Sequence, residues 1–132
     1  MERRRILVVA LGGTIAMTRS ATGGIAPTLT GQDLVAALPG LADRAAIEAV
    51  SPFQLPGASL TLGHLGEVAR LIAARAWQGV DGVVVVQGTD TIEETAFVLD
   101  CLLAPGLPVV VTGAMRGPET PGADGPANLT AA

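Results

Sequence analysis

With 132 residues the chain has the size of one ordinary domain, and 49% of it is hydrophobic while only 2% is aromatic. Its net charge of −4 argues against a nucleic-acid partner, because no basic face is available to neutralise phosphates. A single cysteine rules out an internal disulfide, and with a single histidine it also rules out a Cys/His metal site. We expect neither a metal nor another cofactor. The chain contains no lysine and no tyrosine, two side chains that often carry chemistry.

The N-terminus carries a run of arginines, Arg3 to Arg5, which could start a secretion signal. The apolar run that follows covers only residues 6–11 and leads directly into Gly12-Gly13, so it is shorter than the hydrophobic region of a signal peptide. No segment of the sequence approaches the ~20 apolar residues of a membrane span. We therefore expect a soluble, cytoplasmic protein with no membrane partner.

Short apolar runs predict three buried strands, at residues 5–11, 82–87 and 108–112. These runs are continuous and rich in valine rather than alternating, which is typical of strands covered on both faces in a parallel sheet. Residues 47–53 form a weaker fourth candidate, since Pro52 suits only an edge strand or the end of a strand.

Helical patterns lie between these strands. Thr30 can cap a helix that runs through Leu38, with Asp33 at its third position. Thr61 begins a stronger helix, whose apolar face consists of Leu62, Leu65, Val68, Ala69, Ile72 and Ala76.

Two further helix starts follow. Thr91 and Glu94 have the spacing of a capping box, and apolar or small residues follow at helical spacing: Ile92, Thr95, Ala96, Leu99 and Leu103. Asp124 before Gly125-Pro126 is typical of another helix start. Because strands and helices alternate, the sequence predicts a three-layer α/β/α fold with a largely parallel sheet.

Loops that follow strands are the places where open α/β sheets carry functional groups. Gly12-Gly13 leave the Thr14 hydroxyl unshielded after the first strand, although such a turn also has a purely structural use. After the second long strand, Thr91 is explained as a helix cap, whereas Thr89 and Asp90 are not. Asp90 either complements the helix dipole or binds a ligand. In a parallel sheet these side chains face one crevice, which can hold a small polar ligand.

A third loop, residues 112–116, ends another buried strand, and Arg116 either anchors this loop or contacts a ligand. His64 lies near the start of a helix, at the surface, with no evident Ser or Cys partner. Cys101 falls within an apolar helical pattern, and we expect it to be a small core residue. Neither a dinucleotide-binding fingerprint nor a Walker loop is present.

Together the three loops resemble the bacterial-type L-asparaginase family, which includes asparaginases and glutaminases. The shared motifs are Gly12-Gly13-Thr14-Ile15-Ala16, then Gly88-Thr89-Asp90-Thr91 followed by Glu93-Glu94, then Gly113 to Arg116 with Ala123 to Pro126 and Asn128-Leu129. They occur in the family's order and span nearly the whole chain. The resemblance implies an N-terminal asparaginase domain and hydrolysis of L-asparagine to L-aspartate and ammonia.

The same resemblance implies a role for each matching residue. Thr14 would be the nucleophile that forms an acyl-enzyme, and Thr89 would activate water or assist proton transfer, while its backbone helps to stabilise the oxyanion. Asp90 would bind the α-ammonium group of the substrate. Gly88 would offer its backbone to the α-carboxylate, and the Ala114 backbone would meet the leaving amide.

The sequence departs from the family pattern in four places. The loop at residues 20–30 lacks the family's tyrosine and carries Gly24-Ile25-Ala26 instead. Gly57 aligns with the family's substrate-binding serine, and Ser59 is offset from it. Gln87 stands where histidine is common. The family's catalytic lysine lies beyond residue 132.

From these departures we expect residues 1–132 to be an incomplete N-terminal domain, without the family's C-terminal domain and with little activity alone. The full-length form is expected to be a homodimer or homotetramer. One alternative is a non-catalytic remnant that binds a small amino acid or a partner subunit. Another is a glutaminase, or the amidase part of a transamidation enzyme, with L-glutamine as the substrate.

Overall fold

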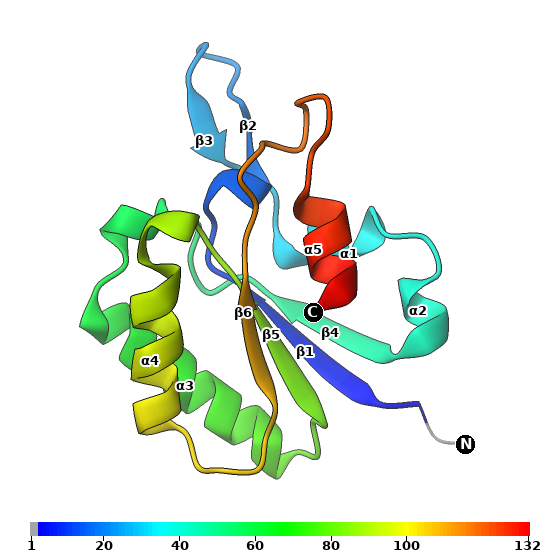
Figure 1. The fold of residues 1–132 in the computed structure, drawn as a ribbon, viewed down its shortest axis with the longest axis vertical. Coiled ribbons are helices and arrows are strands. Elements are labelled where there is room, and N and C mark those ends of the chain that lie inside the picture. The colour runs from blue at the N-terminus through cyan, green and yellow to red at the C-terminus, as the bar shows by residue number, and fades with distance from the viewer. Residues whose placement is uncertain (1–2) are drawn as a thin grey trace.

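The computed structural model describes residues 3–132 and contains a four-stranded sheet in the order β4-β1-β5-β6 (Figure 1). The strands are β1 (Arg5–Ala10), β4 (Ala46–Val50), β5 (Gly82–Val86) and β6 (Val109–Thr112). β1, β5 and β6 lie within predicted strands, β4 begins one residue before the predicted 47–53, and every pairing in this sheet is parallel. The expectation that residues 108–112 are covered on both faces is wrong, because β6 lies at an edge of the sheet and Val110 is 40% exposed. β4 lies at an edge and ends before Pro52, as a proline near a strand end requires.

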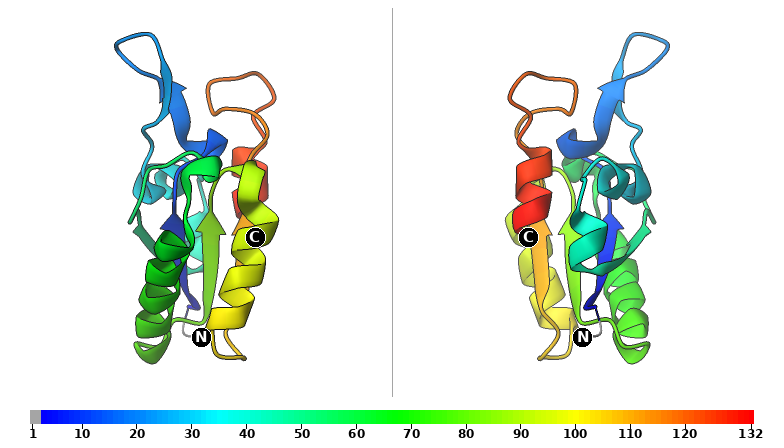
Figure 2. Two further views of the ribbon diagram at one scale, coloured as in Figure 1. Left: turned by 90° about the vertical axis from the view of Figure 1, so that its left-hand side faces the viewer. Right: turned by 90° about the vertical axis from the view of Figure 1, so that its right-hand side faces the viewer.

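Helices cover both faces of the sheet, and the two views in Figure 2 look onto these two layers. On one face lie α3 (Leu62–Trp77) and α4 (Ile92–Leu102). The other face carries α1 (Gly31–Ala36) and α5 (Gly125–Ala131), with the short α2 (Leu41–Arg44) near β4. The predicted three-layer α/β/α fold is confirmed.

Each layer has its own hydrophobic core, because successive strand side chains point to opposite faces. Leu7, Val9, Val83 and Val85 pack with residues of α3 and α4. Val8, Ala10, Val84 and Val86 pack with Leu34 of α1 and Leu129 of α5. Valines therefore fill β5 on both faces, which explains why its sequence is continuous rather than alternating.

Two of the predicted helix caps are confirmed. The Thr30 hydroxyl accepts a hydrogen bond from the Asp33 N–H (3.2 Å), and the Asp33 carboxylate accepts one from the Thr30 N–H (2.8 Å). At α3 the Thr61 hydroxyl accepts from the His64 N–H (3.3 Å), while His64 Nδ1 accepts from the Thr61 N–H (3.1 Å). These bonds satisfy amides that a helix start leaves without partners.

Some expectations about the helices are wrong. Leu62 is 75% exposed, since it lies in the first turn of α3 where no element covers it. Cys101 is also exposed, because Leu99 turns inward and a residue two positions later points to the opposite side of the helix. Helix α1 ends at Ala36 rather than at Leu38.

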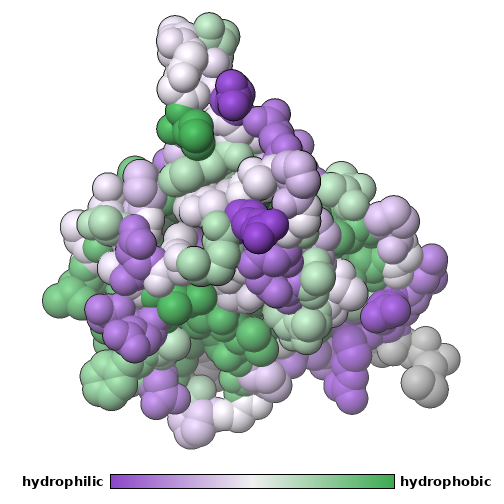
Figure 3. Space-filling view, turned by 45° about the horizontal axis from the view of Figure 1, so that its top comes forward, coloured by the Kyte–Doolittle hydropathy of each residue, from purple (hydrophilic) through white to green (hydrophobic). Residues whose placement is uncertain are grey.

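A small hairpin, β2 (Met17–Arg19) and β3 (Ile25–Pro27), rises from the end of the sheet (Figure 1), and it forms the protrusion at the top of the space-filling view (Figure 3). Strand β3 lies within the loop at residues 20–30 and β2 directly precedes this loop, and the sequence predicts no strand in either segment. Three single turns of 3-10 helix follow strands or loops nearby: Thr14–Ala16, Gly57–Ser59 and Thr89–Thr91. These turns reverse the chain at the carboxyl ends of the strands.

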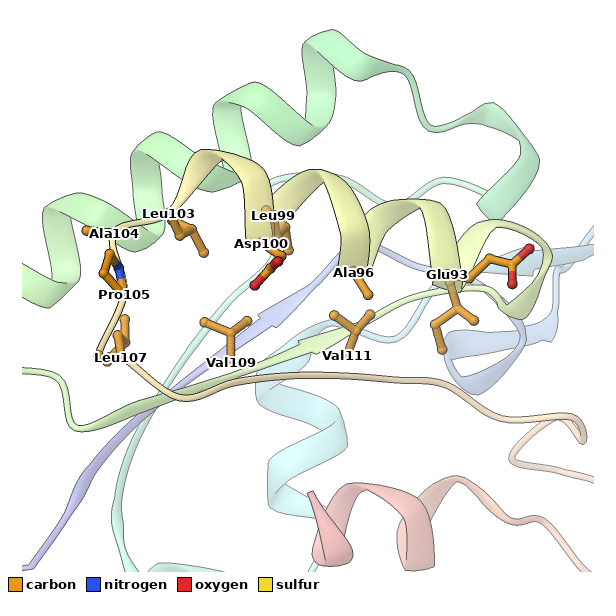
Figure 4. A pocket seen from close by; sticks show the side chains of 12 residues that line it. Glu93, Ala96, Leu99, Asp100, Leu103, Ala104, Pro105, Leu107, Val109 and Val111 are labelled. Carbon is orange, nitrogen blue, oxygen red and sulfur yellow. The ribbon is translucent and has the colours of Figure 1, made fainter.

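A hollow of about 650 Å³ lies between α4 and β6. Figure 4 shows Ala96 and Leu99 of α4 facing Val109 and Val111 of β6 across it. Its lining is mainly apolar, and it opens beside β6, the outer strand of the sheet. No helix among residues 3–132 has the length and apolar character needed to cross a bilayer.

Candidate active site

Glycine backbones bring the predicted functional loops into direct contact. Gly13 has a φ of 82°, a conformation that other residues adopt only with strain. An ideal Cβ on Gly13 would lie 2.0 Å from the Gly88 nitrogen, and one on Gly88 would lie 2.8 Å from the Gly57 nitrogen. Only residues without a side chain can approach so closely. The three loops that carry Gly13, Gly57 and Gly88 therefore meet at one point.

The contact between Gly13 and Gly88 positions the two candidate hydroxyl groups, those of Thr14 and Thr89. Thr14 directly follows Gly13, and Thr89 directly follows Gly88, so the two threonines begin short 3-10 turns on either side of the glycine contact. Both are partly exposed, and Asp90 beside them is exposed. The N–H groups of such first turns have no partner within the turn and are available to an anionic group.

The loop after β6 joins the same site. An ideal Cβ on Gly113 would lie 2.5 Å from the Gln87 carbonyl oxygen and 3.3 Å from Thr89 Cγ2. Ala114, the next residue, is 1% exposed. The site thus forms where β1, β5 and β6 end, which is where parallel α/β sheets bind ligands.

Two side chains from the start of α5 hold this loop. The Asp124 carboxylate accepts hydrogen bonds from the N–H groups of Met115 and Arg116, both at 2.9 Å. Asn128 Nδ2 donates to the Gly113 carbonyl oxygen (2.9 Å) and to Asp124 Oδ2 (3.2 Å). The sequence indicates the helix start at Asp124 correctly, but it does not reveal that the carboxylate turns back to the preceding loop.

The remaining candidates divide into those at the site and those outside it. Gly57 is buried against Gly88, whereas Ser59 lies at the exposed end of the same turn. Arg116 anchors its loop, since its Nη1 donates to the Pro121 carbonyl oxygen (3.1 Å). His64 serves the cap of α3, and its ring packs on Phe53 with a centroid distance of 4.6 Å.

The predicted capping role of Thr91 is wrong. Among the described residues, its side chain caps no amide of α4, because a 3-10 turn precedes this helix and changes the direction of the chain. The Thr91 hydroxyl instead donates to the Gly57 carbonyl oxygen (3.0 Å) and accepts from Gln87 Nε2 (3.3 Å). Gln87, which is fully buried, also donates to the Gly88 carbonyl oxygen (3.0 Å). The only sequence signal for this network is an amide side chain directly after a buried strand.

Hydrogen bonds from the Met115 and Arg116 backbones lower the pKa of Asp124. Because its pKa is lower in the folded state, Asp124 stabilises the fold above the ordinary pKa of an aspartate. This contribution is lost as the pH falls through the lowered value. Asp33 and Asp81 also have lowered pKa values, through the Thr30 and Arg5 backbone N–H groups respectively.

We expect Asp124→Asn to destabilise the chain at neutral pH and to matter less in acid. An asparagine side chain has one carbonyl oxygen and cannot accept from both amides as the carboxylate does. Urea denaturation at about pH 6 and about pH 3 measures the effect, and the difference from the wild-type chain should shrink at the lower pH. Asp43→Asn, at an exposed position of α2, is the matched control. An equal difference at both pH values would contradict the role of the Asp124 charge.

Residues 3–132 contain no group of three or more His, Cys, Asp or Glu side chains arranged to hold a metal ion. The groups at the site are hydroxyls, a carboxylate and backbone amides, held on short turns at the ends of parallel strands. This arrangement places hydroxyl, carboxylate and backbone N–H groups together at the carboxyl edge of a parallel α/β sheet.

Comparison with known proteins identifies the family. Residues 5–132 match the family model described as "Asparaginase, N-terminal". The chain belongs to the asparaginase family and corresponds to its N-terminal domain. It is 44% identical over 126 residues to a protein of Deinococcus radiodurans named "Probable L-asparaginase", and 38% identical over 128 residues to an L-asparaginase of Bacillus licheniformis. These matches cover 95% and 96% of this chain.

Solved structures agree with the sequence matches. The crystal structure of a "Probable Cytoplasmic L-asparaginase from Campylobacter jejuni" superposes with a TM-score of 0.86 at 34% identity, over 96% of this chain and 38% of that one. The thermostable L-asparaginase from Thermococcus kodakarensis superposes with a TM-score of 0.80 at 30% identity, over 95% of this chain and 38% of that one. The chain spans 37% of the Deinococcus radiodurans relative and 39% of the Bacillus licheniformis relative.

Proposed function

We propose that the chain supplies the nucleophile and the amino-acid-binding loops of an amidohydrolase that converts L-asparagine to L-aspartate and ammonia. The observation that carries this proposal is the contact between Gly13 and Gly88, which holds Thr14 and Thr89 next to one another beside Asp90. Membership of the asparaginase family supports the choice of reaction.

In this reaction Thr14 Oγ1 attacks the carbon of the side-chain amide, and the developing oxyanion is stabilised by backbone N–H groups of the short turns. The carbon–nitrogen bond then breaks, and the hydroxyl proton leaves with the nitrogen as ammonia. A water molecule, oriented by Thr89, hydrolyses the acyl ester and restores Thr14. The reaction consumes one water and releases L-aspartate, without an oxidant or a cofactor.

The substrate's own charges would be recognised by the same loops. Asp90 would bind the α-ammonium group, because it is an exposed carboxylate next to Thr89. Backbone amides near Gly57 and Gly88, together with Ser59, would face the α-carboxylate. The loop of Gly113 and Ala114, held by Asp124 and Asn128, would meet the leaving amide.

A second candidate substrate is L-glutamine. The chain is 32% identical over 131 residues to a Methanosphaera stadtmanae protein that is named as one of the subunits of "Glutamyl-tRNA(Gln) amidotransferase", over 98% of this chain and 30% of that protein. The two substrates differ by one methylene group, which an apolar pocket discriminates by about 1–3 kcal/mol.

The test uses a chimera, because this chain contains neither lysine nor tyrosine to activate Thr14 and matches only part of its relatives. Residues 1–132 are joined to the portion of the Deinococcus radiodurans protein that follows its matched segment. We expect this chimera to release ammonia from L-asparagine, and the ratio of kcat/KM for L-asparagine and L-glutamine decides between the two substrates. A folded chimera that hydrolyses neither would contradict the proposal.

The cellular location and the oligomeric state are part of the same proposal. We propose a cytoplasmic location, which is supported by the similarity to the Campylobacter jejuni protein described as cytoplasmic. For the full-length form we propose a homodimer or homotetramer, which light scattering coupled to size-exclusion chromatography measures directly.

A further inference from the structure

Gln87 and Thr91 form a buried hydrogen-bond relay with a single direction. The Gly88 carbonyl oxygen can only accept, so Gln87 must turn its Nε2 toward it, at 3.0 Å. The same Nε2 lies 3.3 Å from Thr91 Oγ1, which therefore acts as an acceptor there. The one hydroxyl proton of Thr91 is then directed to the Gly57 carbonyl oxygen, at 3.0 Å.

The relay joins two segments that are distant in the sequence. Gly57 begins the turn Gly57–Ser59, and its carbonyl oxygen also accepts from the Leu60 N–H (3.1 Å). Gly88 begins the segment that carries Thr89 and Asp90. The direct contact between Gly57 and Gly88 sets how closely the backbones approach, and the relay sets how they are oriented.

This arrangement has a cost. Within residues 3–132, Gln87 Oε1 and Thr95 Oγ1 are buried and have no hydrogen-bond partner. A buried polar atom without a partner lowers stability, and an apolar side chain at position 87 would avoid this loss. We therefore interpret the bonds from Gln87 Nε2 as holding Gly88 and Thr91 in place rather than as adding to the stability of the core.

We propose that Gln87 and Thr91 are positioning residues that set the affinity of the site for an α-amino acid, while the chemical step at Thr14 does not depend on them. This inference rests on the proposed function and deepens it. The relay acts on Gly57 and Gly88, the loops that would face the α-carboxylate, and makes no contact with Thr14. Loosening it should raise KM by a larger factor than it lowers kcat, because Thr14 keeps its place while Gly88 and the following Thr89 are held less firmly.

The chain contains a matched pair of threonines for the test. Thr91 directly precedes α4 and Thr95 lies in its first turn, and replacement by valine removes one hydroxyl and keeps the shape at either position. The Thr91 hydroxyl has partners, whereas the Thr95 hydroxyl has none among the described residues. Thr91→Ser keeps the hydroxyl. Gln87→Met is a second variant that keeps the length of the side chain and removes its donor.

Two measurements on the 132-residue chain test the relay by nuclear magnetic resonance. The first is amide hydrogen exchange at Leu60, whose N–H donates to the Gly57 carbonyl oxygen, relative to Val85 in β5. The second is the Kd of the product L-aspartate. Thr91→Val should speed exchange at Leu60 and raise the Kd by about five-fold or more, since it removes the hydrogen bond to the Gly57 carbonyl oxygen, and Gln87→Met should shift both quantities in the same direction. Thr95→Val and Thr91→Ser should stay within about two-fold of wild type.

Equal effects of Thr91→Val and Thr95→Val, or an unchanged exchange rate at Leu60 in Thr91→Val, would overturn the relay. If exchange at Leu60 responds as expected and the affinity for L-aspartate does not, the relay is structural and the positioning role is wrong. A wild-type chain that binds no L-aspartate counts against the proposed function. In that case the exchange rate at Leu60 still tests whether the relay holds Gly57. The KM and kcat of the chimera then test whether Gln87 and Thr91 are positioning residues.

Discussion

Gly13→Ala is expected to destabilise the chain by about 3 kcal/mol and to separate the two threonine loops. An ideal Cβ at this position would lie 2.0 Å from the nitrogen and 2.3 Å from the Cα of Gly88. These are backbone atoms, so no side chain can rotate away to relieve the overlap. Either Gly88 moves, which displaces Thr89, or the turn at Gly13 opens, which displaces Thr14. The free energy of unfolding from urea denaturation measures the loss.

Gly23→Ala is the matched control for this prediction. Gly23 also has a positive φ, 89°, but nothing lies within 4 Å of its ideal Cβ. The control therefore carries the strain of a left-handed alanine, about 1 kcal/mol, without the overlap. Similar losses for Gly13→Ala and Gly23→Ala would show that the close approach of Gly13 to Gly88 does not hold the site together.

Thr14→Ala is expected to reduce the turnover of L-asparagine by the chimera by about a thousand-fold or more, because no other hydroxyl can take the place of a covalent nucleophile. The fold should remain, since Thr14 is partly exposed and alanine suits a short turn. Binding of L-aspartate should also remain, because Asp90 and the backbone of Gly88 are unchanged. Ammonia release under single-turnover conditions measures the chemical step.

Two controls accompany this substitution. Thr14→Ser keeps a hydroxyl and should retain measurable turnover, whereas Thr22→Ala removes an exposed hydroxyl at the tip of the hairpin and should leave turnover as in the wild type. Turnover by Thr14→Ala near the wild-type rate would remove Thr14 from the role of nucleophile. Thr89, the other threonine at the glycine contact, would then be the candidate nucleophile.

The two substitutions separate the architecture of the site from its chemistry. Gly13→Ala changes the distance between the loops and leaves both hydroxyl groups in the chain. Thr14→Ala removes one hydroxyl and leaves the loops in contact. If the site works as proposed, the first should lower stability, affinity for L-aspartate and turnover together, whereas the second should lower turnover alone.

Local patterns in the sequence were sufficient for the sheet and most of its helices. Runs of valine such as residues 83–86 predict strands buried on both faces, and the structure places them in a parallel sheet. Capping at Thr30 and Thr61 was predictable because its partners lie only three residues away. That Thr14, Thr89 and Asp90 lie at the same edge of the sheet was predictable because the carboxyl ends of parallel strands meet there.

What only the tertiary structure decided depends on partners that are remote in the chain. Thr91 has the local signature of a cap, yet its proton goes to Gly57, 34 residues earlier. Leu62 and Cys101 fit helical patterns, but exposure depends on whether another element covers them. The glycine contact and the relay from Gln87 have no local signature, because each needs loops that are remote in the sequence to arrive at the same point. The sequence by itself therefore determined the fold class and the residues to consider, whereas the three-dimensional packing decided which of them act together.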